Sequence, residues 1–519
     1  EPVLRVARKP FLSSSPRGFM RHAVIAACWI SVIIAGIFLR FDQLATRPFH
    51  ADEATGARIT ASRMTSGDYR FDPQHYHGPL LSELAIPFCE WKGEDVWQEL
   101  TKHTLRLLPA VAGSLLLLVP LLWRRRFGDA PMLTASALLA TSPLLVYYSR
   151  MFIHESLLVL FGMLALVSLI RFPRYGIPGL LIGLMFATKE SFAISIIAWS
   201  GAAVLVTWEN REKLDRVFYI SAWENYRAPV LASLLAAAVS SAFFYTDGFR
   251  QPHGAVDAIR TFFVYETVAG HDKPFAYYLQ LLAFPMKSGG LWWFGTPVVI
   301  LALVAFAKSF RRDAESPAVV RFIAYAAAGH FAIYSIIAYK TPWLACLPWA
   351  HVCLLAGFGI AGFSRDRLPV KAAICALVGV CITSQFIQTR RATGRFASDE
   401  RNPFAYVPTR NDIETLEPWL AKLRLAAPAI SHEPAAVIGT DYWPLPWYLR
   451  SFKEIGYWPA PPDDLAARAL VFAMPDTLDA VTARLEKSHV SVPRGLRAGV
   501  PVQLFVRNDV WKLWMESGK

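Results

Sequence analysis

Residues 22–39 read HAVIAACWISVIIAGIFL, an unbroken apolar run near the start of the chain. A helix needs about 20 mostly apolar residues to cross a hydrocarbon core about 30 Å thick, so this run predicts a membrane-spanning helix. No small-residue cleavage site follows it cleanly, which favours a retained helix over a secretory signal. Basic residues precede the run and indicate a cytoplasmic N-terminal side: Arg5, Arg8, Lys9, Arg17 and Arg21.

Similar apolar runs recur along the next 350 residues or so, each of about the length of a membrane span. They lie at 104–123, 130–149, 155–171, 175–189, 191–208, 228–246, 291–307, 319–339, 342–363 and 370–388. We therefore expect an α-helical polytopic membrane domain of about eleven transmembrane helices in residues 1–388.

The composition supports this fold class. Of the 519 residues, 54% are hydrophobic and only 18% are charged, and the chain contains 17 Trp, 34 Phe and 18 Tyr. Such an apolar chain is neither disordered nor a purely soluble protein, and the aromatic content is typical of membrane interfaces. The net charge of +13 does not indicate a nucleic-acid partner, because the basic residues lie in short loops between apolar runs.

The charged loops predict the topology. Basic clusters at 124–126, 171–174, 211–216, 308–312 and 365–371 all fall on the side of the N-terminus, as the positive-inside rule requires. The opposite, extracytoplasmic side then holds segments 41–103, 150–154, 189–190, 247–290, 340–342 and everything after 388. We expect an integral, multi-pass protein of the cytoplasmic (inner) membrane.

Residues 389–519 have a different sequence pattern from the rest of the chain. Amphipathic patterns predict helices at 412–425 and 476–487, and short apolar runs predict strands at 435–439, 469–473 and 500–506. Their alternation predicts a small extracytoplasmic α/β domain. The six cysteines contain no C-x-x-C pair and predict neither a disulfide framework nor a zinc site.

The first outer segment contains His50-Ala51-Asp52-Glu53 just past the first span. Placing paired acids beside a membrane surface costs free energy, so such acids are expected to be solvated by water or to serve a function. One interpretation is structural, with Asp52 capping a helix that runs through Arg63 and Glu53 near its positive end. The other interpretation is a catalytic carboxylate.

Further charged side chains are expected at the same outer surface. Two histidines two residues apart, His75 and His77, lie in a turn ending in Gly78-Pro79, and such a spacing is weak evidence for a metal. The other outer segments contribute Arg150, Glu155, Lys189, His271, Lys273 and Lys340. For Arg150 a snorkelling side chain, and for Lys189 an ion pair with Glu190, are the structural alternatives. Acids and bases that converge from separate segments indicate a site.

These motifs resemble the GT-C superfamily of polyprenyl-phosphate-dependent glycosyltransferases. Asp52-Glu53 matches the acidic pair of the protein O-mannosyltransferase-like branch, and Arg150, Glu155 and Lys189 lie where that branch has charged motifs. The chain is most similar to the flippase-activity-associated membrane proteins of archaeal N-glycosylation and their bacterial relatives. That likeness rests on His50–Glu53, His77–Pro79, His271–Phe275, Lys340–Trp343 and Tyr442–Arg450.

The resemblance implies a membrane glycosyltransferase, a hexosyltransferase that moves a sugar from a polyprenyl-phosphate donor to a glycan, lipid or protein acceptor. It makes Asp52 the catalytic base, with Glu53 in support. The donor would be bound by Arg150, Glu155, Lys189, His271, Lys273, Lys340 and His77. No Asp-x-Asp occurs in the first outer segment, so no metal is expected, although His50, His75 and His77 leave a divalent cation open.

Two other functions stay open at this point. A flippase for lipid-linked sugars would need polar residues at bilayer depth, for which His330 and His351 are the main candidates. A receptor or assembly factor would use the α/β domain to bind a partner. Within that domain, the aromatic motif from Asp441 to Arg450 suits either docking on the membrane interface or stacking against a sugar.

Overall fold

The structure is a computed structural model of the whole chain. It describes residues 16–518 except 67–68, 172–175, 214, 266–269, 315, 363–366 and 453. The basic residues Arg5, Arg8, Lys9, Arg174 and Arg365, used above for the topology, lie outside the described residues.

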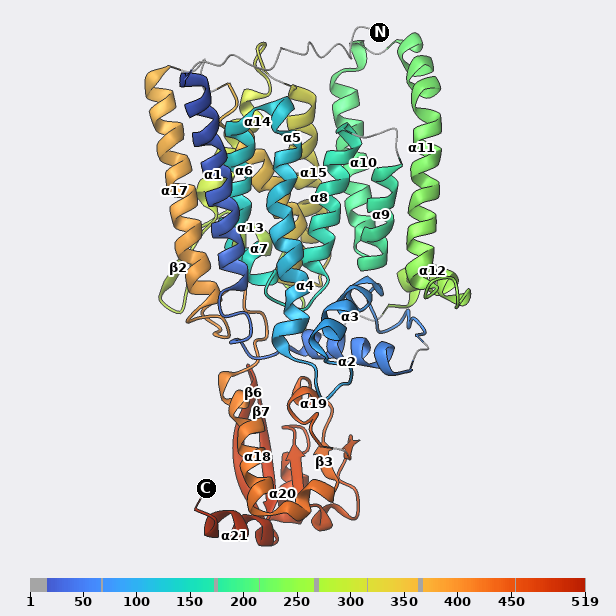
Figure 1. The fold of residues 1–519 in the computed structure, drawn as a ribbon, viewed down its shortest axis with the longest axis vertical. Helices are drawn as coiled ribbons and strands as arrows, with labels where there is room; N and C mark the ends of the chain where they lie inside the picture. Colours follow the sequence, from blue (N-terminus) through green and yellow to red (C-terminus); the bar gives the residue numbers. More distant parts are fainter. Residues whose placement is uncertain are drawn as a thin grey trace.

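A bundle of roughly parallel helices makes up most of the described chain (Figure 1). Its members are α1 (Pro16–Phe41), α4 (Lys102–Leu115) with α5 (Val119–Phe127), α6 (Asp129–Thr141), α8 (Glu155–Arg171), α9 (Ile177–Thr188), α10 (Phe192–Glu209), α11 (Arg216–Tyr245), α14 (Thr296–Lys308), α15 (Pro317–Ile336), α16 (Cys346–Phe358) and α17 (Leu368–Thr393). Each apolar run predicted from the sequence overlaps with at least one of these helices.

Six helices in the described part of the chain are long and apolar enough to cross a bilayer. They are Met20–Phe41, Lys102–Phe127, Phe192–Glu209, Ile220–Tyr245, Pro317–Ile336 and Leu368–Thr393. Shorter apolar helices pack among them. The outer bundle surface is apolar as well; Leu234 of α11, for example, is 63% exposed. Such a surface is stable only in lipid, which confirms a polytopic membrane domain.

The two ends of the bundle differ. The start of α1 and the connection between α10 and α11 lie at one end, hereafter the basic end (Figure 1). At the other end, hereafter the loop end, lie α2 (Ala51–Ser66), α3 (Leu80–Lys92), α7 (Pro143–Tyr148), α12 (His253–Val264) and α13 (Tyr277–Leu282). The long outer segments are therefore largely helical.

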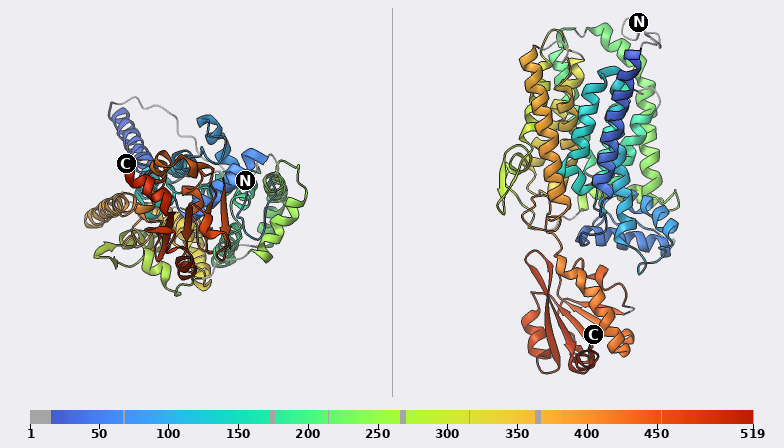
Figure 2. Two further views of the ribbon diagram at one scale, coloured as in Figure 1. Left: turned by 90° about the horizontal axis from the view of Figure 1, so that it is seen from below. Right: turned by 60° about the vertical axis from the view of Figure 1, so that its left-hand side comes forward.

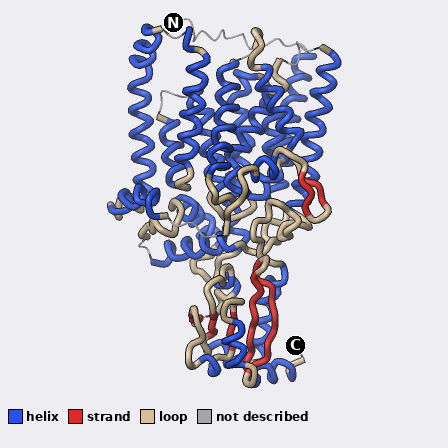
Figure 3. The backbone as a smooth tube through the Cα atoms, turned by 180° about the vertical axis from the view of Figure 1, so that it is seen from behind, coloured by secondary structure: helices blue, strands red, loops and turns tan. Residues whose placement is uncertain are grey.

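One predicted span starts in the wrong place. The run at 291–307 was expected to be a helix throughout, but Leu291–Trp293 forms strand β2 and the helix begins only at Thr296. β2 pairs antiparallel with β1 (Met286–Ser288), and this hairpin lies at the side of the bundle near the loop end (Figure 3). Gly289 and Gly290 form its turn, both with positive φ, which few other residues adopt.

The C-terminal part is an α/β domain that stands clear of the bundle at the loop end (Figure 2). Its five-stranded sheet has the order β4-β3-β5-β7-β6, with β3 parallel to β4 and β5 and with β7 antiparallel to β5 and β6. The strands are β3 (Ala435–Ile438), β4 (Ile455–Trp458), β5 (Leu470–Ala473), β6 (His489–Arg497) and β7 (Val500–Arg507). Its helices are α18 (Leu416–Ala426), α19 (Leu445–Tyr448), α20 (Leu478–Leu485) and α21 (Asn508–Glu516).

The segment between the bundle and this domain packs on the bundle. The hydroxyl of Tyr147 donates to the carbonyl of Ala397 (2.8 Å), and the hydroxyl of Tyr148 donates to that of Phe404 (2.6 Å). The ring of Phe404 also meets Trp293 edge-on at 5.9 Å. Residues 394–410 are therefore a fixed connection, and they carry side chains into the loop end.

Candidate active site

Helix α2 places Asp52 in its first turn. The carbonyl of His50 accepts the first helical bond from Ala54, so His50 is the N-cap, and its Nδ1 accepts from the Asp52 N–H at 3.2 Å. Glu53 Oε2 accepts from the His50 N–H at 3.0 Å, as in a capping box. The predicted helix is present, but His50 and Glu53 perform the capping that was considered for Asp52. The Asp52 carboxylate is left 53% exposed.

Glu53 is buried in an ion pair. Its two oxygens accept from Nε and Nη2 of Arg106, both at 2.7 Å, and Oε1 also accepts from the Phe152 N–H at 2.8 Å. Burial alone would raise the pKa of Glu53, but the guanidinium groups of Arg106 and Arg47 outweigh it and lower the pKa to about 2. A carboxylate this acidic and this fully bonded holds α2 against α4 and does not exchange protons near neutral pH.

Groups from two other outer segments and the connecting segment face Asp52. Its negative charge contributes to raising the pKa of His271, Tyr265, Tyr339 and Tyr406. His271 Nδ1 and the Tyr406 hydroxyl are 2.5 Å apart. Burial and nearby positive charge lower the pKa of His271 against the opposing effect of Asp52, so the imidazole is neutral at pH 7. Asp52 thus lies in a polar site built from segments distant in sequence.

Two lysines lie next to His271. Lys340 is buried, and its Nζ donates to the carbonyls of Lys273 (3.0 Å) and Ile337. Its backbone N–H donates to the carbonyl of His271 at 3.0 Å, which ties the two segments together. The Nζ of Lys273 lies 5.7 Å from the centre of the Tyr406 ring. In the described part of the chain no carboxylate pairs with either ammonium group, so no acidic side chain balances either positive charge.

Lys189 and His77 belong to a neighbouring cluster. Lys189 Nζ donates to Glu155 at 2.6 Å, with both side chains buried, and His77 Nδ1 lies 3.0 Å from Glu190. Burial would raise the pKa of Glu190, but His77 and Lys189 lower it to about 2. The charge of Lys189 is therefore balanced within the protein.

Tyr265 links this cluster to the site of Asp52. Its ring stacks on His77 with centres 5.1 Å apart. The charges of Asp52, Lys189 and Glu190 all affect the pKa of its hydroxyl. The two clusters therefore border one another.

Arg150 neither snorkels nor faces the Asp52 carboxylate. Its guanidinium donates to the carbonyls of Leu39 (2.9 Å) and Gln43 (3.2 Å), at the end of α1. Arg47 in turn donates to the Arg150 carbonyl at 3.0 Å. Through these bonds, Arg150 fixes the second outer segment beside α1.

The α/β domain holds the residue before the N-cap of α2. The Phe49 N–H donates to the Tyr448 hydroxyl at 2.9 Å, and the Thr409 hydroxyl donates to the Phe49 carbonyl at 2.8 Å. The rings of Phe49 and Trp447 are 4.1 Å apart. Trp447 and Tyr448 therefore dock on the first outer segment, and their burial there leaves them no contact with lipid.

Sequence reasoning missed two residues of this site. Arg106 was detectable, because a lone arginine inside an apolar span predicts an acidic partner. Tyr406 carries no such signal, since only the folded chain brings its hydroxyl to His271 and its carbonyl to within 3.1 Å of His50 Nε2.

The histidines expected at bilayer depth are packing groups. His330 Nδ1 bonds the Ala326 carbonyl (2.7 Å) and His351 Nδ1 bonds the Leu347 carbonyl (2.8 Å), each in its own helix. Trp199 donates to His351 Nε2 at 3.1 Å, and all three side chains are buried. This internal cluster lines no path across the membrane, so it does not favour the flippase hypothesis.

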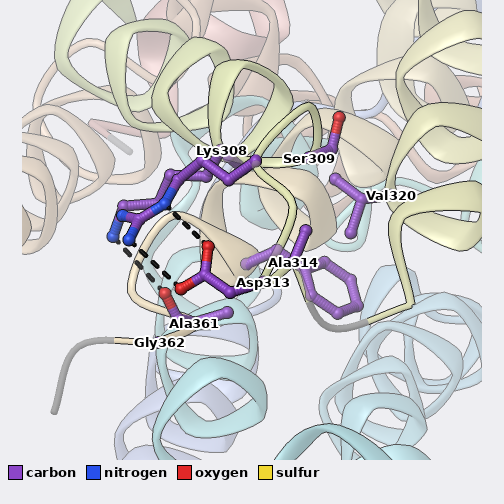
Figure 4. Close-up of a pocket in the computed structure, with 10 residues that line it drawn as sticks. Lys308, Ser309, Asp313, Ala314, Val320, Ala361 and Gly362 are labelled. Carbon is purple, nitrogen blue, oxygen red and sulfur yellow. Dashed lines mark hydrogen bonds and ion pairs between the residues drawn. The ribbon is translucent and has the colours of Figure 1, made fainter. Parts of the chain in front are cut away.

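Two further observations concern possible ligands. Within the described ranges, no group of three or more His, Cys, Asp or Glu side chains is arranged to hold a metal ion. A small cavity of about 40 Å³ lies between α14, α15 and α16, lined by Lys308, Asp313 and Ala361 (Figure 4). Lys308 Nζ donates there to the Gly359 carbonyl at 3.2 Å. This cavity is at the basic end and has no part in the Asp52 site.

Comparisons with known proteins concern the sequence family and the fold. Residues 96–241 match the family model of dolichyl-phosphate-mannose-protein mannosyltransferases. No curated protein sequence matches the chain. The fold is similar to ArnT from Cupriavidus metallidurans without ligand (TM-score 0.58, 16% identity, 94% of this chain and 98% of that one). It is also similar to the same protein bound to undecaprenyl phosphate (0.56, 14%, 96% and 99%). The archaeal oligosaccharyltransferase AglB from Archaeoglobus fulgidus, in complex with an inhibitory peptide and a dolichol-phosphate, is a further match (0.51, 13%, 88% and 70%).

Proposed function

We propose that this chain, a member of the GT-C superfamily with a mannosyltransferase-type domain, transfers a sugar from a polyprenyl-phosphate donor to an acceptor hydroxyl at its loop end. One observation carries the proposal: the exposed carboxylate of Asp52 lies within electrostatic range of polar side chains from two outer segments and from the connecting segment. Lipid phosphates bound by two of the similar structures, undecaprenyl phosphate and dolichol-phosphate, support the donor class.

Asp52 is the general base of the proposed reaction. It accepts the proton of the acceptor hydroxyl while that oxygen bonds to the anomeric carbon of the donor sugar. The bond from this carbon to the phosphate oxygen breaks in the same step, so the anomeric configuration inverts and polyprenyl phosphate leaves. Glu53 does not share the role, because its bonds to Arg106 keep it ionised and inaccessible.

The departing phosphate gains negative charge, which nearby cations stabilise. Lys273 and Lys340 suit this task, because carbonyls and a ring surround them and leave their charge unbalanced. His271 donates a hydrogen bond from one ring nitrogen in its neutral form. Lys189 acts as a support because Glu155 balances its charge, and Arg150 does so because its guanidinium is bonded at the end of α1, away from the Asp52 carboxylate.

A monophosphate leaving group can be neutralised by lysines alone, so the proposed reaction needs no metal ion. We place the site at the extracytoplasmic face of the cytoplasmic membrane, because the basic loops lie at the opposite end of the bundle. The acceptor is a glycan, lipid or protein hydroxyl.

Incubation of the purified full-length protein with labelled polyprenyl-phosphate sugars and a panel of acceptors tests the proposal. We expect labelled product and free polyprenyl phosphate in equal amounts, unchanged by EDTA. Consumption of no donor by the folded protein would contradict the transferase assignment. Activity lost in EDTA and restored by Mn²⁺ or Mg²⁺ would contradict only the absence of a metal.

A further inference from the structure

Aromatic side chains gather on the α/β domain where it faces α2. Tyr442, between β3 and α19, lies 4.8 Å from Tyr457 of β4, with an angle of 37° between the rings. Trp443 lies 6.3 Å from Tyr442 at 30°. Tyr457 is 37% exposed, and β4 is the edge strand of the sheet. The rings therefore present an accessible surface beside α2.

Arg58 of α2 adds a cation to this surface. The side chain is exposed, and its guanidinium lies 5.3 Å from the ring centre of Trp97, which in turn meets Trp447 at 5.6 Å. No carboxylate in the described ranges pairs with Arg58. Its charge acts on Tyr457, where it opposes the burial and the neighbouring Tyr442 that raise the pKa of this phenol to about 12.

The surface continues to the proposed base. Asp52 and Arg58 are six positions apart on α2, which corresponds to a rise of about 9 Å along the helix. Around the helix the two residues are about 120° apart, and the half-buried Thr55 lies between them in angle, so one broad side of α2 carries all three. An extended molecule with one hydroxyl at Asp52 would therefore reach Arg58 and the aromatic rings.

The protein holds this surface in a fixed shape. Arg497 pairs with the Asp441 carboxylate and donates to its carbonyl at 3.0 Å, just before Tyr442. The Gly439 N–H donates to the Trp458 carbonyl at 2.8 Å, which joins the turn to β4. Because the rings are ordered in advance, binding a ligand costs little side-chain entropy.

We propose that Tyr442, Tyr457 and Arg58 form an acceptor-binding surface for an anionic glycan. Aromatic rings offer a flat apolar body to a sugar ring, and a guanidinium with no internal partner suits a carboxylate or phosphate substituent. A membrane is a poor occupant, since α19 and β3 lie beyond α2 and α3 on the side away from the bundle (Figure 1). The inference rests on the proposed transferase function, because it identifies the class of acceptor.

A glycan array that carries neutral, uronic-acid and phosphorylated oligosaccharides tests this surface with the detergent-purified full-length protein. We expect binding to anionic glycans, weakened about 10-fold or more in Arg58→Gln and roughly 2- to 10-fold in Tyr457→Ala. Tyr457→Phe keeps the ring and should bind like the wild type. Arg410→Gln removes an exposed arginine of the connecting segment and is the matched control.

The array reports binding without turnover, so it separates this inference from the proposed function. Asp52→Asn should bind glycans normally while sugar transfer falls roughly 10²- to 10⁴-fold. Absence of any glycan binding, or binding that survives both Arg58→Gln and Tyr457→Ala, would overturn the acceptor surface and leave the transferase proposal standing. Binding of neutral glycans alone would overturn the anionic class. Thermal unfolding of each variant shows whether a loss of binding reflects a loss of fold.

Discussion

At the scale of single residues, adjacent acids have opposite environments. The Asp52 carboxylate is half exposed and lies 3.9 Å from the His50 ring, whereas Glu53 is fully buried and bonded to Arg106, Arg47 and two backbone N–H groups. Neighbouring positions on a helix point about 100° apart, which sends one carboxylate to solvent and the other to the interior. We propose that this difference makes Asp52 the reactive acid and Glu53 the structural one.

Replacing Glu53 with Gln should destabilise the fold. The change leaves the Arg106 charge buried and unpaired, which typically costs about 3–5 kcal/mol of unfolding free energy. Unfolding in detergent, followed by circular dichroism, measures this loss. Asp52→Asn is the matched control and should unfold like the wild type.

The pH dependence of unfolding checks the same pair. The pKa of Glu53 is about 2 in the folded protein against an ordinary value of 4.5, so its contribution is complete above pH 4.5 and is lost as the pH falls towards 2. The difference in stability between wild type and Glu53→Gln should shrink over that interval. A difference that does not change with pH there would contradict the ion-pair assignment.

Donor affinity should distinguish the lysines. Lys273→Ala and Lys340→Ala remove cations whose charge no carboxylate in the described ranges balances, so we expect donor binding to weaken about 10-fold or more in each. Lys189→Ala and Arg150→Ala should affect stability more than donor affinity. Titration of each folded variant with a polyprenyl-phosphate sugar measures the difference. Normal binding by both Lys273→Ala and Lys340→Ala would place the phosphate elsewhere.

At the scale of elements, apolar periodicity and length predicted most of the spans and three strands of the α/β domain well. The expected strands at 435–439, 469–473 and 500–506 correspond to β3, β5 and β7. The half-exposed β4 and the long, irregular β6 carry weak apolar patterns and were not predicted. Helices α3, α12 and α13 in the outer segments were also missed, because polar and proline-rich stretches read as loops.

The candidate site was predictable only in part. The charged motifs of the outer segments are visible in the sequence, but their partners are not. Which cation is free depends on tertiary pairing: Lys189 and Lys340 look alike in sequence, yet one lies against Glu155 and the other against carbonyls. Such contacts join segments distant in sequence, 34 positions apart for Lys189 with Glu155 and 399 for Phe49 with Tyr448.

The contact between α19 and the start of α2 should matter for turnover. Tyr448→Phe removes the hydroxyl that accepts the Phe49 N–H and donates to the Glu414 carboxylate, a loss of about 0.5–1.5 kcal/mol for the first bond and about 1.5–3 kcal/mol for the second. Because Phe49 precedes the N-cap of α2, we expect a lower kcat with little change in donor affinity. Steady-state kinetics and donor titration measure the two quantities. Unchanged kcat would show that this bond does not position Asp52.

At the scale of the whole molecule, the bundle presents its basic end and its loop end on opposite sides of a membrane. The α/β domain and helix α2, which carries Asp52, share one end (Figure 1). The connecting segment and the α/β domain both contact the first outer segment, so the domain is part of the site rather than an independent module. This arrangement explains why a transferase of lipid-linked sugars would carry such a domain.

Protease accessibility in sealed membrane vesicles tests the orientation. With right-side-out vesicles, added protease should cleave within residues 411–518, and with inverted vesicles it should cleave only after the vesicles are opened. The positive-inside rule is the physical reason for this expectation. Cleavage of the domain in intact inverted vesicles would show that the number of spans is wrong by one.

The central claim is that Asp52 removes the proton of the acceptor hydroxyl. The most direct measurement compares sugar transfer and donor binding in wild type and Asp52→Asn. The amide has nearly the same shape but does not accept a proton at neutral pH, so turnover should fall roughly 10²- to 10⁴-fold while donor affinity and unfolding temperature stay unchanged. Wild-type turnover in the folded Asp52→Asn protein would contradict the claim.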